Sequence, residues 1–329
     1  MQTHTSARII GTGSFLPDKV LTNLKLEKIV DTNDEWIRAR TGIVERRIAD
    51  RQTAASDLSI KAAEKALKKA DIKAEELDLI IVATITPDYL FPATACIVQD
   101  KLGAKNAAAF DLLAACSGFV YGVSVAEQFI KSRTYKYILV IGVEVLSKFI
   151  DWTDRNTCIL FGDGAGAAVL GPAQEDGGFI FTRLGADGSG GDHLMLPGGG
   201  SRIPCTTSSV ENGLHYLRMS GSEIFKFAVK IMEESTVEAL ENCGLEVNDI
   251  DLLIPHQANL RIINSAAKRI GLPVERVWTN IQRFGNMSAA SIPVALDEAV
   301  TEKRIVPGSI LVLVGFGAGL TWGINIIRW

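Results

Sequence analysis

Several features that would narrow the class of protein are missing from this sequence. It has no apolar run of about 18 residues, so the sequence predicts no transmembrane helix. The segment at its start lacks a basic stretch followed by an apolar core, and we therefore expect no signal peptide. Its five cysteines are scattered without CxxC pairs, which fits a reducing cytoplasm and predicts no metal site.

A strong excess of one charge is also missing. The sequence has 34 Lys and Arg residues against 38 Asp and Glu residues, a formal net charge of −4, so the overall balance predicts no nucleic-acid partner. Hydrophobic residues make up 47% and charged residues 22% of the 329 residues, as in soluble globular proteins. A chain of this length forms one large domain or two of ordinary size.

What the sequence does contain is an internal repeat. The order strand, helix, strand, helix, strand occurs twice, and Gly103 and Phe110 in the first copy match Gly271 and Trp278 in the second, both with an offset of 168. Each copy predicts a mostly parallel sheet with helices on its faces, so the fold class is a duplicated α/β architecture. We expect two halves, residues 1–174 and 175–329, joined by a polar segment that contains Gly and Pro.

Residues 106–132 hold the clearest candidate for chemistry. A short apolar run at 107–113 predicts a buried strand, and an amphipathic helix follows with only small residues between them, including Cys116. A thiol at a helix N-terminus is expected to be stabilised as the thiolate by the helix dipole and unpaired N–H groups. The residue types allow either a nucleophile or a small cysteine packed in the core.

The repeat also predicts which residues meet Cys116. It places the counterpart segment 285–286, with Asn286, beside the Cys116 elbow, and it brings in the end of a strand that carries His256 and Asn259. Each residue alone has an ordinary structural role: a buried histidine, a turn residue and a helix cap. Together, at the ends of apolar strands, they indicate a Cys-His-Asn site.

A basic segment at 32–47 is less specific. Trp36, Arg40, Arg46 and Arg47 either hold an anionic ligand or form a solvated surface.

Five segments of the chain resemble the 3-oxoacyl-(acyl-carrier-protein) synthase III family, the condensing enzymes that start bacterial type II fatty-acid synthesis. They are, in order, DEWIRARTGI, AACSGF, DRNT with FGDGAGA, PHQAN and GNMSAAS. The resemblance covers nearly the whole chain and implies the thiolase fold, five αβαβα layers built from two related βαβαβ halves. It also implies a cytoplasmic, homodimeric acyltransferase without a cofactor, which uses an acyl-CoA such as acetyl-CoA and malonyl-acyl carrier protein.

The resemblance implies a role for each site residue. Cys116 accepts the acyl group, which a thiolate does well because it is both a good nucleophile and a good leaving group. His256 and Asn286 promote decarboxylation of the malonyl group by donating neutral N–H groups to the enolate oxygen. The oxyanion hole for the acyl steps comprises the N–H of Cys116 and the loop of Gly317, Ala318 and Gly319. The family usually has three glycines there, and Ala318 keeps its donor only with a negative φ.

Further positions match binding residues of the family. The resemblance places Trp36 and Arg155 around the CoA adenine and Arg40 near its phosphates. The matching residues of the pantetheine channel and its mouth are Phe225, Lys226 and Asn259, and Asn156 stands where many members have Gly.

Other matches concern the primer and the carrier protein. Phe91 matches a residue that enters the partner subunit's acyl pocket, and an aromatic side chain there predicts a short primer. Docking of the acidic carrier protein is implied for Arg261, Lys268 and Arg269, for which a solvated helix face is the alternative.

Other functions would share part of this sequence pattern. A related enzyme that starts a quinolone or polyketide pathway would keep the Cys-His-Asn site and change the acyl donor or acceptor. A degradative thiolase would need a second cysteine in the C-terminal loop, which is missing. A non-catalytic CoA-binding protein would lose the three residues, and an acyl-CoA thioesterase would hydrolyse its substrate without consuming malonyl thioester.

Overall fold

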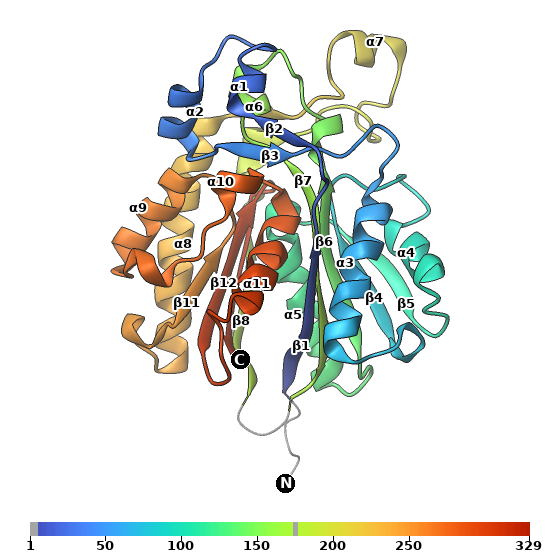
Figure 1. Cartoon of the computed structure of the whole chain (residues 1–329), viewed down its shortest axis with the longest axis vertical. Helices are drawn as coiled ribbons and strands as arrows, with labels where there is room; N and C mark the ends of the chain where they lie inside the picture. The colour runs from blue at the N-terminus through green and yellow to red at the C-terminus, as the bar shows by residue number, and fades with distance from the viewer. Residues whose placement is uncertain (1–5, 174–176) are drawn as a thin grey trace.

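The computed structural model of the chain describes residues 6–173 and 177–329 and contains two large mixed β-sheets (Figure 1). The first sheet has the strand order β1 (Ala7–Phe15), β7 (Asp163–Pro172), β6 (Ile138–Val145), β4 (Leu79–Ala83) and β5 (Ala108–Leu112). The second has the order β8 (Gly178–Ala186), β13 (Thr321–Arg328), β12 (Ile310–Gly317) and β11 (Leu252–Pro255). The two strand orders correspond, with β8, β13, β12 and β11 in the places of β1, β7, β6 and β4. At the position that matches β5, the described residues of the second sheet have a parallel bridge between Leu253 and Val277 in place of a strand.

The prediction of mostly parallel sheets is wrong. In the first sheet β4 is parallel to β5 and β6, but β7 is antiparallel to both β6 and β1. In the second sheet only β11 and β12 are parallel. The cause is plain for β12 and β13, because residues 318–320 between them are too few for the crossover that parallel strands need.

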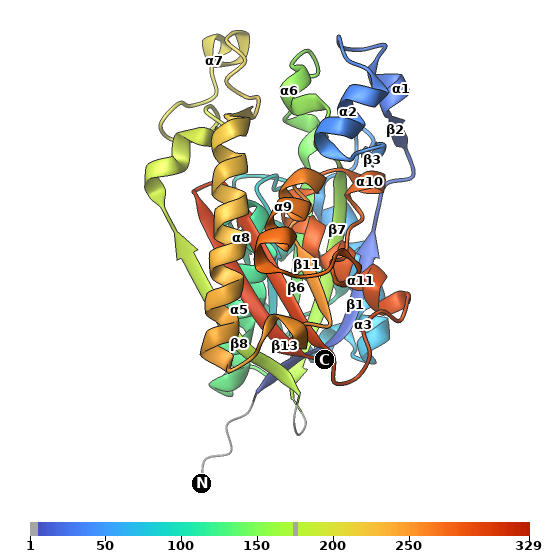
Figure 2. The same cartoon turned by 90° about the vertical axis from the view of Figure 1, so that its left-hand side faces the viewer.

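Helices form three layers around the two sheets, as Figures 1 and 2 show. The outer face of the first sheet is covered by α3 (Ala55–Ala70) and α4 (Thr94–Leu102). Between the sheets lie α5 (Gly118–Lys131) and α11 (Ser291–Thr301), and the outer face of the second sheet is covered by α8 (Gly221–Cys243) and α9 (Leu260–Ile270). The α/β fold class with αβαβα layers is thereby confirmed.

A hydrophobic core fills the space at each contact between a sheet and its helices. Strand β4 shows how one segment serves two cores, because side chains alternate across a strand. Leu79 and Ile81 belong to the core between the sheets, whereas Ile80 and Val82 belong to the core under α3 and α4. A strand that is buried on both faces is a continuous apolar run in the sequence, so strand β4 could be predicted from the sequence.

The shorter elements gather mainly above the carboxyl ends of the parallel strands, at the end of the molecule opposite to the C-terminus and to the start of β1 (Figure 1). They are α1 (Asn23–Leu26), α2 (Asp34–Thr41), α6 (Arg155–Cys158), α7 (Thr207–Glu211), α10 (Ile281–Phe284), and the strand pairs β2 (Val20–Thr22) with β3 (Glu45–Arg47) and β9 (Leu194–Met195) with β10 (Arg218–Met219). Short 3₁₀ turns include η2 (Ala115–Ser117), η3 (Leu146–Lys148), η4 (Gly188–His193) and η7 (Ser288–Ala290). Within the described ranges, no helix is both long and apolar enough to cross a membrane.

Two glycines in neighbouring strands bring α11 onto the first sheet. Gly142 of β6 pairs with Gly166 of β7. A Cβ on Gly142 would collide with the carbonyl oxygen of Ala289, and one on Gly166 would lie 2.6 Å from the nitrogen of Val294. Gly166 belongs to the segment FGDGAGA, most of which lies in the single strand β7, and its lack of a side chain permits this close packing.

Each large sheet takes its strands from one side of residues 173–177. The predicted boundary between residues 174 and 175 itself lies outside the described residues and stays a prediction.

Candidate active site

Two matching elbows, one from each half, meet at the centre of the molecule. Turn η2 leads into α5 and turn η7 leads into α11, and the two turns are in contact. Each begins with a residue of positive φ, Ala115 and Ser288, both at 46°. The sequence analysis paired the Cys116 elbow with residues 285–286, but the structural counterpart of Ala115 is Ser288. Asn286 nevertheless lies just before the second elbow.

Cys116 lies in η2, directly before α5, and its side chain is buried. It borders two cavities, one mostly apolar and one with many polar side chains. Burial raises the pKa of the Cys116 thiol to about 12, and a polar contact with Ser288 offsets this only in part. Desolvation therefore opposes the stabilisation of the thiolate that the sequence analysis expected from the helix end.

The polar cavity, of about 660 Å³, runs from Cys116 toward α2. It brings together predicted residues from both halves of the chain. Among its lining residues are Cys116, His256, Asn286, Gly317, Asn259, Phe225, Lys226, Arg261, Trp36, Arg40 and Asn156. One cavity thus joins the predicted Cys-His-Asn group to the predicted binding residues.

His256 follows β11 and is held by a 2.8 Å hydrogen bond from its backbone N–H to the carbonyl of Val314. Its ring packs edge-on against Phe316, with the ring centres 5.2 Å apart. Burial lowers the pKa of His256 to about 3, so the imidazole is neutral near pH 7. Because Nδ1 has no hydrogen-bond partner in the described chain, the tautomer protonated at Nε2 avoids a buried unpaired N–H.

A hydrogen bond orients the side-chain amide of Asn286. Its Oδ1 accepts a 2.8 Å hydrogen bond from the backbone N–H of Ser288. Its backbone N–H donates to Leu160, and its carbonyl accepts from Gly162. With the oxygen occupied, the amide nitrogen of Asn286 is the group available to a ligand. His256 and Asn286 therefore offer two neutral N–H donors to the polar cavity, and such donors stabilise a developing oxyanion.

The loop after β12 approaches Cys116 closely. A Cβ on Gly317 would lie 2.7 Å from the nitrogen of Cys116, so only glycine fits without movement. Ala318 has no positive φ, and the condition set for it by the sequence analysis is met. Ala318 and Gly319 line the apolar cavity beside Cys116.

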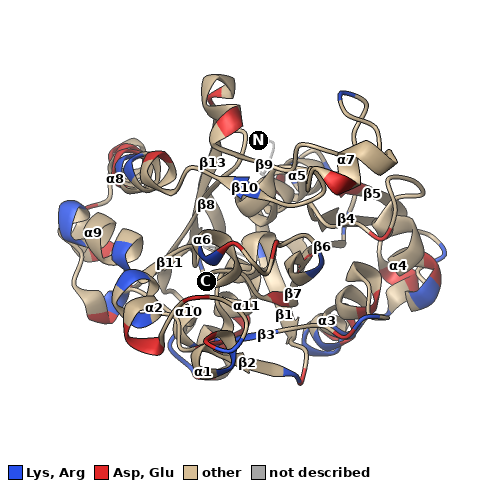
Figure 3. Ribbon diagram, turned by 90° about the horizontal axis from the view of Figure 1, so that it is seen from above, with Lys and Arg blue, Asp and Glu red and all other residues tan. Residues whose placement is uncertain are grey.

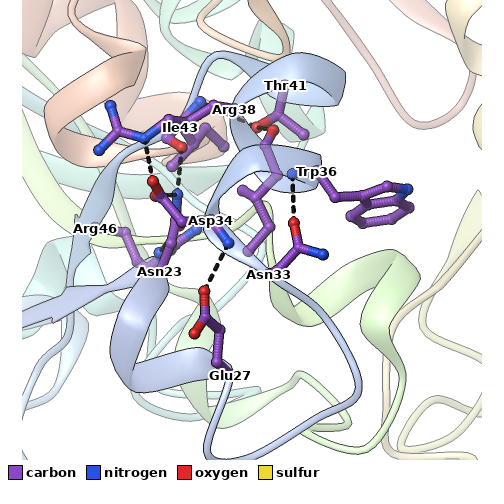
Figure 4. Close-up of polar contacts among 10 residues, drawn as sticks. Asn23, Glu27, Asn33, Asp34, Trp36, Arg38, Thr41, Ile43 and Arg46 are labelled. Atoms are coloured by element: carbon purple, nitrogen blue, oxygen red, sulfur yellow. Dashed lines mark hydrogen bonds and ion pairs between the residues drawn. The ribbon is translucent and has the colours of Figure 1, made fainter.

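Trp36 points away from the polar contacts that hold α2 in place (Figure 4). Its backbone N–H donates to the cap residue Asn33 at 2.8 Å. The guanidinium groups of Arg40 and Arg155 each lie 5.2 Å from the centre of its ring. Arg155 also lies 3.7 Å from the Asp31 carboxylate. For a planar ligand ring to bind between Trp36 and Arg155, the arginine side chain has to move away from the tryptophan ring.

Arg46 fits neither role that the sequence analysis considered. It is fully buried and donates hydrogen bonds to the carbonyls of Leu21 and Ile159 and to Asn23 Oδ1, at 3.1, 2.6 and 2.8 Å. It is a structural residue that ties β2, β3 and α6 together. Arg47 is half-buried, with its guanidinium 5.9 Å from the centre of the Phe284 ring.

Asn259 is a helix cap. Its Oδ1 caps α9 by accepting the backbone N–H of Arg261 at 2.9 Å, and its Nδ2 donates to the carbonyl of Arg40 at 3.1 Å. It lines the polar cavity as well.

The predicted docking residues lie on α9, beside α2, and Figure 3 marks Lys and Arg positions in blue along the ribbons of both helices. Arg261 lies 5.6 Å from the centre of the Phe225 ring at the mouth of the polar cavity. Arg269 forms a 3.1 Å ion pair with Glu233, and Lys268 is exposed.

The apolar cavity, of about 670 Å³, extends from Cys116 in the other direction. Its wall includes Ile85, Leu146, Phe149, Phe161, Leu194 and Leu217, which the sequence analysis did not identify. Phe91 is 85% exposed and does not line this cavity of its own chain, although its neighbours Tyr89 and Leu90 do. Across residues 6–173 and 177–329, no group of three His, Cys, Asp or Glu side chains is arranged to hold a metal ion.

The sequence analysis also missed Ser288 and Glu144. Ser288 lies in the segment GNMSAAS, which drew attention only through Asn286. Glu144 could have been noticed in the sequence, because it is an acidic residue within the apolar run of β6. Nothing in the sequence indicated that it lies near the second elbow.

Comparisons with known proteins agree with this arrangement. Residues 110–188 match the family model described as 3-oxoacyl-[acyl-carrier-protein (ACP)] synthase III, and residues 240–329 match the model of its C-terminal part. The chain is 57% identical over 324 residues, 98% of each chain, to the beta-ketoacyl-[acyl-carrier-protein] synthase III of Caldanaerobacter subterraneus subsp. tengcongensis.

Solved structures are similar over the same extent. The 3-oxoacyl-[acyl-carrier-protein] synthase III of Aquifex aeolicus is 49% identical, with a TM-score of 0.92 and coverage of 98% of this chain and 100% of that one. The priming beta-ketosynthase of the R1128 polyketide pathway is 35% identical, with a TM-score of 0.91 and coverage of 98% and 96%.

Proposed function

The chain belongs to the 3-oxoacyl-[acyl-carrier-protein] synthase III family and is an acyltransferase, a condensing enzyme that initiates fatty-acid synthesis, and we propose that Cys116, His256 and Asn286 carry out its two half-reactions. The observation that supports these roles is the meeting of the three side chains in the wall of one cavity. The cavity draws the thiol from one half of the chain and the two N–H donors from the other.

In the first half-reaction, Cys116 attacks the thioester carbonyl of an acyl-CoA and releases CoA. The carbonyl oxygen becomes negatively charged in the tetrahedral intermediate, and the backbone N–H groups of Cys116 and of the 317–319 loop stabilise it. The close approach of Gly317 to Cys116 supports this role for the loop. The acyl group then lies in the apolar cavity, whose wall is built of aliphatic and aromatic side chains.

In the second half-reaction, malonyl-acyl carrier protein loses CO₂, and the resulting enolate attacks the acyl group on Cys116. His256 Nε2–H and Asn286 Nδ2–H hold the enolate oxygen. Both groups are uncharged near neutral pH, so they neither protonate the carbanion nor repel the malonyl carboxylate. The product is a 3-oxoacyl-acyl carrier protein.

The substrates bind along the polar cavity. Trp36 and Arg155 hold the adenine of CoA, Arg40 lies near its phosphates, and Phe225 and Asn259 line the pantetheine channel. The acidic carrier protein docks on Arg261, Lys268 and Arg269 of α9. No further cofactor takes part in this scheme.

The enzyme works as a homodimer with a short primer such as acetyl-CoA. Leu90, Phe91 and Leu113 are 81%, 85% and 80% exposed, and Leu90 and Leu113 line the apolar cavity. A second copy covers these side chains, and Phe91 of each copy enters the apolar cavity of the other and limits the length of the acyl chain. The five free cysteines support a cytoplasmic location.

Intact mass after incubation with acetyl-CoA tests these roles, with longer and branched acyl-CoAs in parallel and Cys116→Ala as the control. We expect one acyl group on the wild-type chain and none on the variant. A folded chain that gains no acyl group and releases no CoA would overturn the role of Cys116. Release of CoA without a stable adduct or malonyl consumption would indicate a thioesterase, and an adduct that never condenses with malonyl-acyl carrier protein would indicate a starter synthase of specialised metabolism.

A further inference from the structure

Two hydroxyl side chains join the Cys116 elbow to the loop after β12. Ser117 follows Cys116 directly and is fully buried, and Thr321 is the first residue of β13 and is half-buried. The Ser117 Oγ donates a 2.8 Å hydrogen bond to the Thr321 Oγ1. The two residues come from opposite halves of the chain. Their bond therefore crosses between the two segments whose N–H groups are proposed to form the oxyanion hole.

Each hydroxyl of this pair also meets a backbone carbonyl. Ser117 Oγ lies 2.7 Å from the Ala114 oxygen, and Thr321 Oγ1 lies 3.1 Å from the same oxygen. Thr321 Oγ1 lies 3.0 Å from the Ala318 oxygen as well. Each hydroxyl has one proton, and a separation of 2.8 Å between two hydroxyl oxygens indicates that one proton lies between them. Ser117 therefore donates to Thr321, and the Thr321 proton goes to Ala318 or to Ala114.

Either direction of the Thr321 proton ties the elbow to the loop. With Ala318 as the acceptor, the hydrogen bonds run from Ser117 through Thr321 to the loop. With Ala114 as the acceptor, two hydrogen bonds cross between the two segments. The Ala114 carbonyl also accepts the Ser117 backbone N–H at 3.2 Å, so it has a partner in both cases. This favours Ala318 as the acceptor.

The loop after β12 depends on such contacts, because the ladder between β12 and β13 stops where the loop begins. Leu320 exchanges two 2.8 Å backbone hydrogen bonds with Asp187, which hold one side of the loop. On the other side, the Ala318 carbonyl belongs to the same planar peptide group as the Gly319 N–H. The Thr321 hydroxyl therefore sets the orientation of that peptide group.

The elbow and the end of β12 are packed without spare room. A Cβ on Gly317 would lie 2.7 Å from the Cys116 nitrogen, and one on Gly315 would lie 3.0 Å from the Ser117 Cα. Packing this close limits how near the two segments come, but it does not stop them from moving apart. The hydrogen-bonded hydroxyl pair supplies the attraction that does.

We propose that Ser117 and Thr321 are positioning residues, which hold the loop after β12 against the Cys116 elbow at the spacing that the oxyanion hole requires. This inference rests on the proposed roles of Cys116 and of the loop. Neither hydroxyl residue is part of the wall that the described residues form around the two cavities. Both act on the reaction through the backbone N–H groups that they place.

The test measures acylation of Cys116 by acetyl-CoA in a single turnover, by rapid acid quench and intact mass, at increasing acetyl-CoA concentration. Thr321→Ser keeps the hydroxyl and Thr321→Ala removes it, so the two variants differ by one oxygen. We expect Thr321→Ala to lower the maximal rate by about 10- to 100-fold, whereas Thr321→Ser should stay within about threefold of the wild-type chain. The half-saturating concentration should change by less than about threefold, because the oxyanion exists only in the tetrahedral intermediate.

Ser117→Ala tests the other side of the pair without adding an atom. It should lower the maximal rate by about 10-fold, a smaller loss because Thr321 keeps its bond to a carbonyl. The double variant Ser117→Ala with Thr321→Ala should be at most about threefold slower than Thr321→Ala alone, because each single variant already lacks the shared bond.

Ser124→Ala is the matched control. Ser124 is 3% exposed and lies about two turns further along α5, and its Oγ accepts a 2.9 Å hydrogen bond from Asn325 of β13. It joins the same helix to the same strand, away from Cys116. Ser124→Ala should lower the free energy of unfolding in urea, as Ser117→Ala does, and keep the wild-type rate of acylation.

The outcomes are distinct. Thr321→Ala and Thr321→Ser chains that are folded by circular dichroism and acylated at equal rates would overturn the positioning role and leave that of Cys116 intact. A loss confined to the half-saturating concentration would overturn it too, because it would assign the pair to substrate binding. If Thr321→Ala does not fold, Ser117→Ala decides, and a rate equal to that of Ser124→Ala would contradict the proposal. A wild-type chain that is never acylated would overturn the proposed function, and the positioning role with it.

Discussion

The side-chain oxygen of Asn286 accepts the backbone N–H of Ser288 at 2.8 Å. This one bond sets the direction of the Asn286 amide and also fixes the start of the second elbow. The first prediction follows from this contact.

Asn286→Asp should separate the two half-reactions. The new carboxylate can still accept the Ser288 N–H, so the elbow keeps its form, but the N–H donor is lost and a charge faces the malonyl carboxylate. We expect decarboxylation of malonyl-acyl carrier protein to fall by about 100- to 1,000-fold. Acylation of Cys116, followed by intact mass, should change by less than about threefold. Asn286→Ala, which also loses the bond to Ser288, should slow both steps.

Gly317→Ala should impair acylation through crowding. Its Cβ would lie 2.7 Å from the Cys116 nitrogen and 3.0 Å from its Cβ, so either the thiol or the loop has to move. A misplacement of this kind should lower the acylation rate by about 10- to 100-fold. Gly188→Ala is the control, because a Cβ there meets no atom within 4 Å. Equal rates for the two variants would show that the close approach is unimportant.

Arg46→Met should destabilise the fold without a direct effect on chemistry. It leaves three buried acceptors, on Leu21, Asn23 and Ile159, without their donor. We expect the free energy of unfolding, measured with urea, to fall by about 3 kcal/mol. Arg38→Met removes an exposed ion pair of 2.7 Å with Asp34 and should cost less than about 1 kcal/mol.

Stability should fall in acid partly because of His256. Burial lowers its pKa from 6.5 to about 3. Between these values the unfolded chain binds a proton that the folded chain does not, so this contribution to stability is lost as the pH falls through the window. From pH 7 to pH 5 the loss from this group is about 2 kcal/mol. His256→Gln should show a correspondingly shallower decline in urea unfolding, and parallel curves would contradict the buried neutral imidazole.

Charge reversal on α9 should weaken the carrier protein's docking. Lys268→Glu combined with Arg269→Glu should raise KM for malonyl-acyl carrier protein by about 10-fold, an effect that salt reduces. Acyl transfer from acetyl-CoA should change little. Lys230→Glu, an exposed change on the neighbouring α8, is the control. Equal damage to both half-reactions in the α9 variant would argue against docking there.

The sequence predicted the meeting of Cys116, His256 and Asn286 because the repeat relates strand ends that are far apart in the chain. The predicted pairing of the two elbows is wrong by a few residues. Helices and strands of the two halves are related by a nearly constant difference in residue number, but irregular turns are not. The burial of Glu144 and Ser288 near the site had no local pattern that would have allowed its prediction.

Burial explains the other differences between prediction and structure. Arg46 lies inside a strand of three residues, where periodicity cannot tell an inward arginine from an outward one. The prediction for the Cys116 thiol considered the helix end and left out desolvation. That penalty depends on the second elbow and on the loop at Gly317, which are far from Cys116 in the sequence.

The division of the site between the two halves also matters during synthesis of the chain. Cys116 emerges from the ribosome long before His256, Asn286 and the Gly317 loop. Strand β13, among the last residues made, lies between β12 and β8 inside its sheet rather than at an edge. A nascent or C-terminally truncated chain therefore has the thiol without the surroundings that bury it and supply its N–H donors. Under the proposed mechanism, a chain has to be complete through β13 before it can condense its substrates.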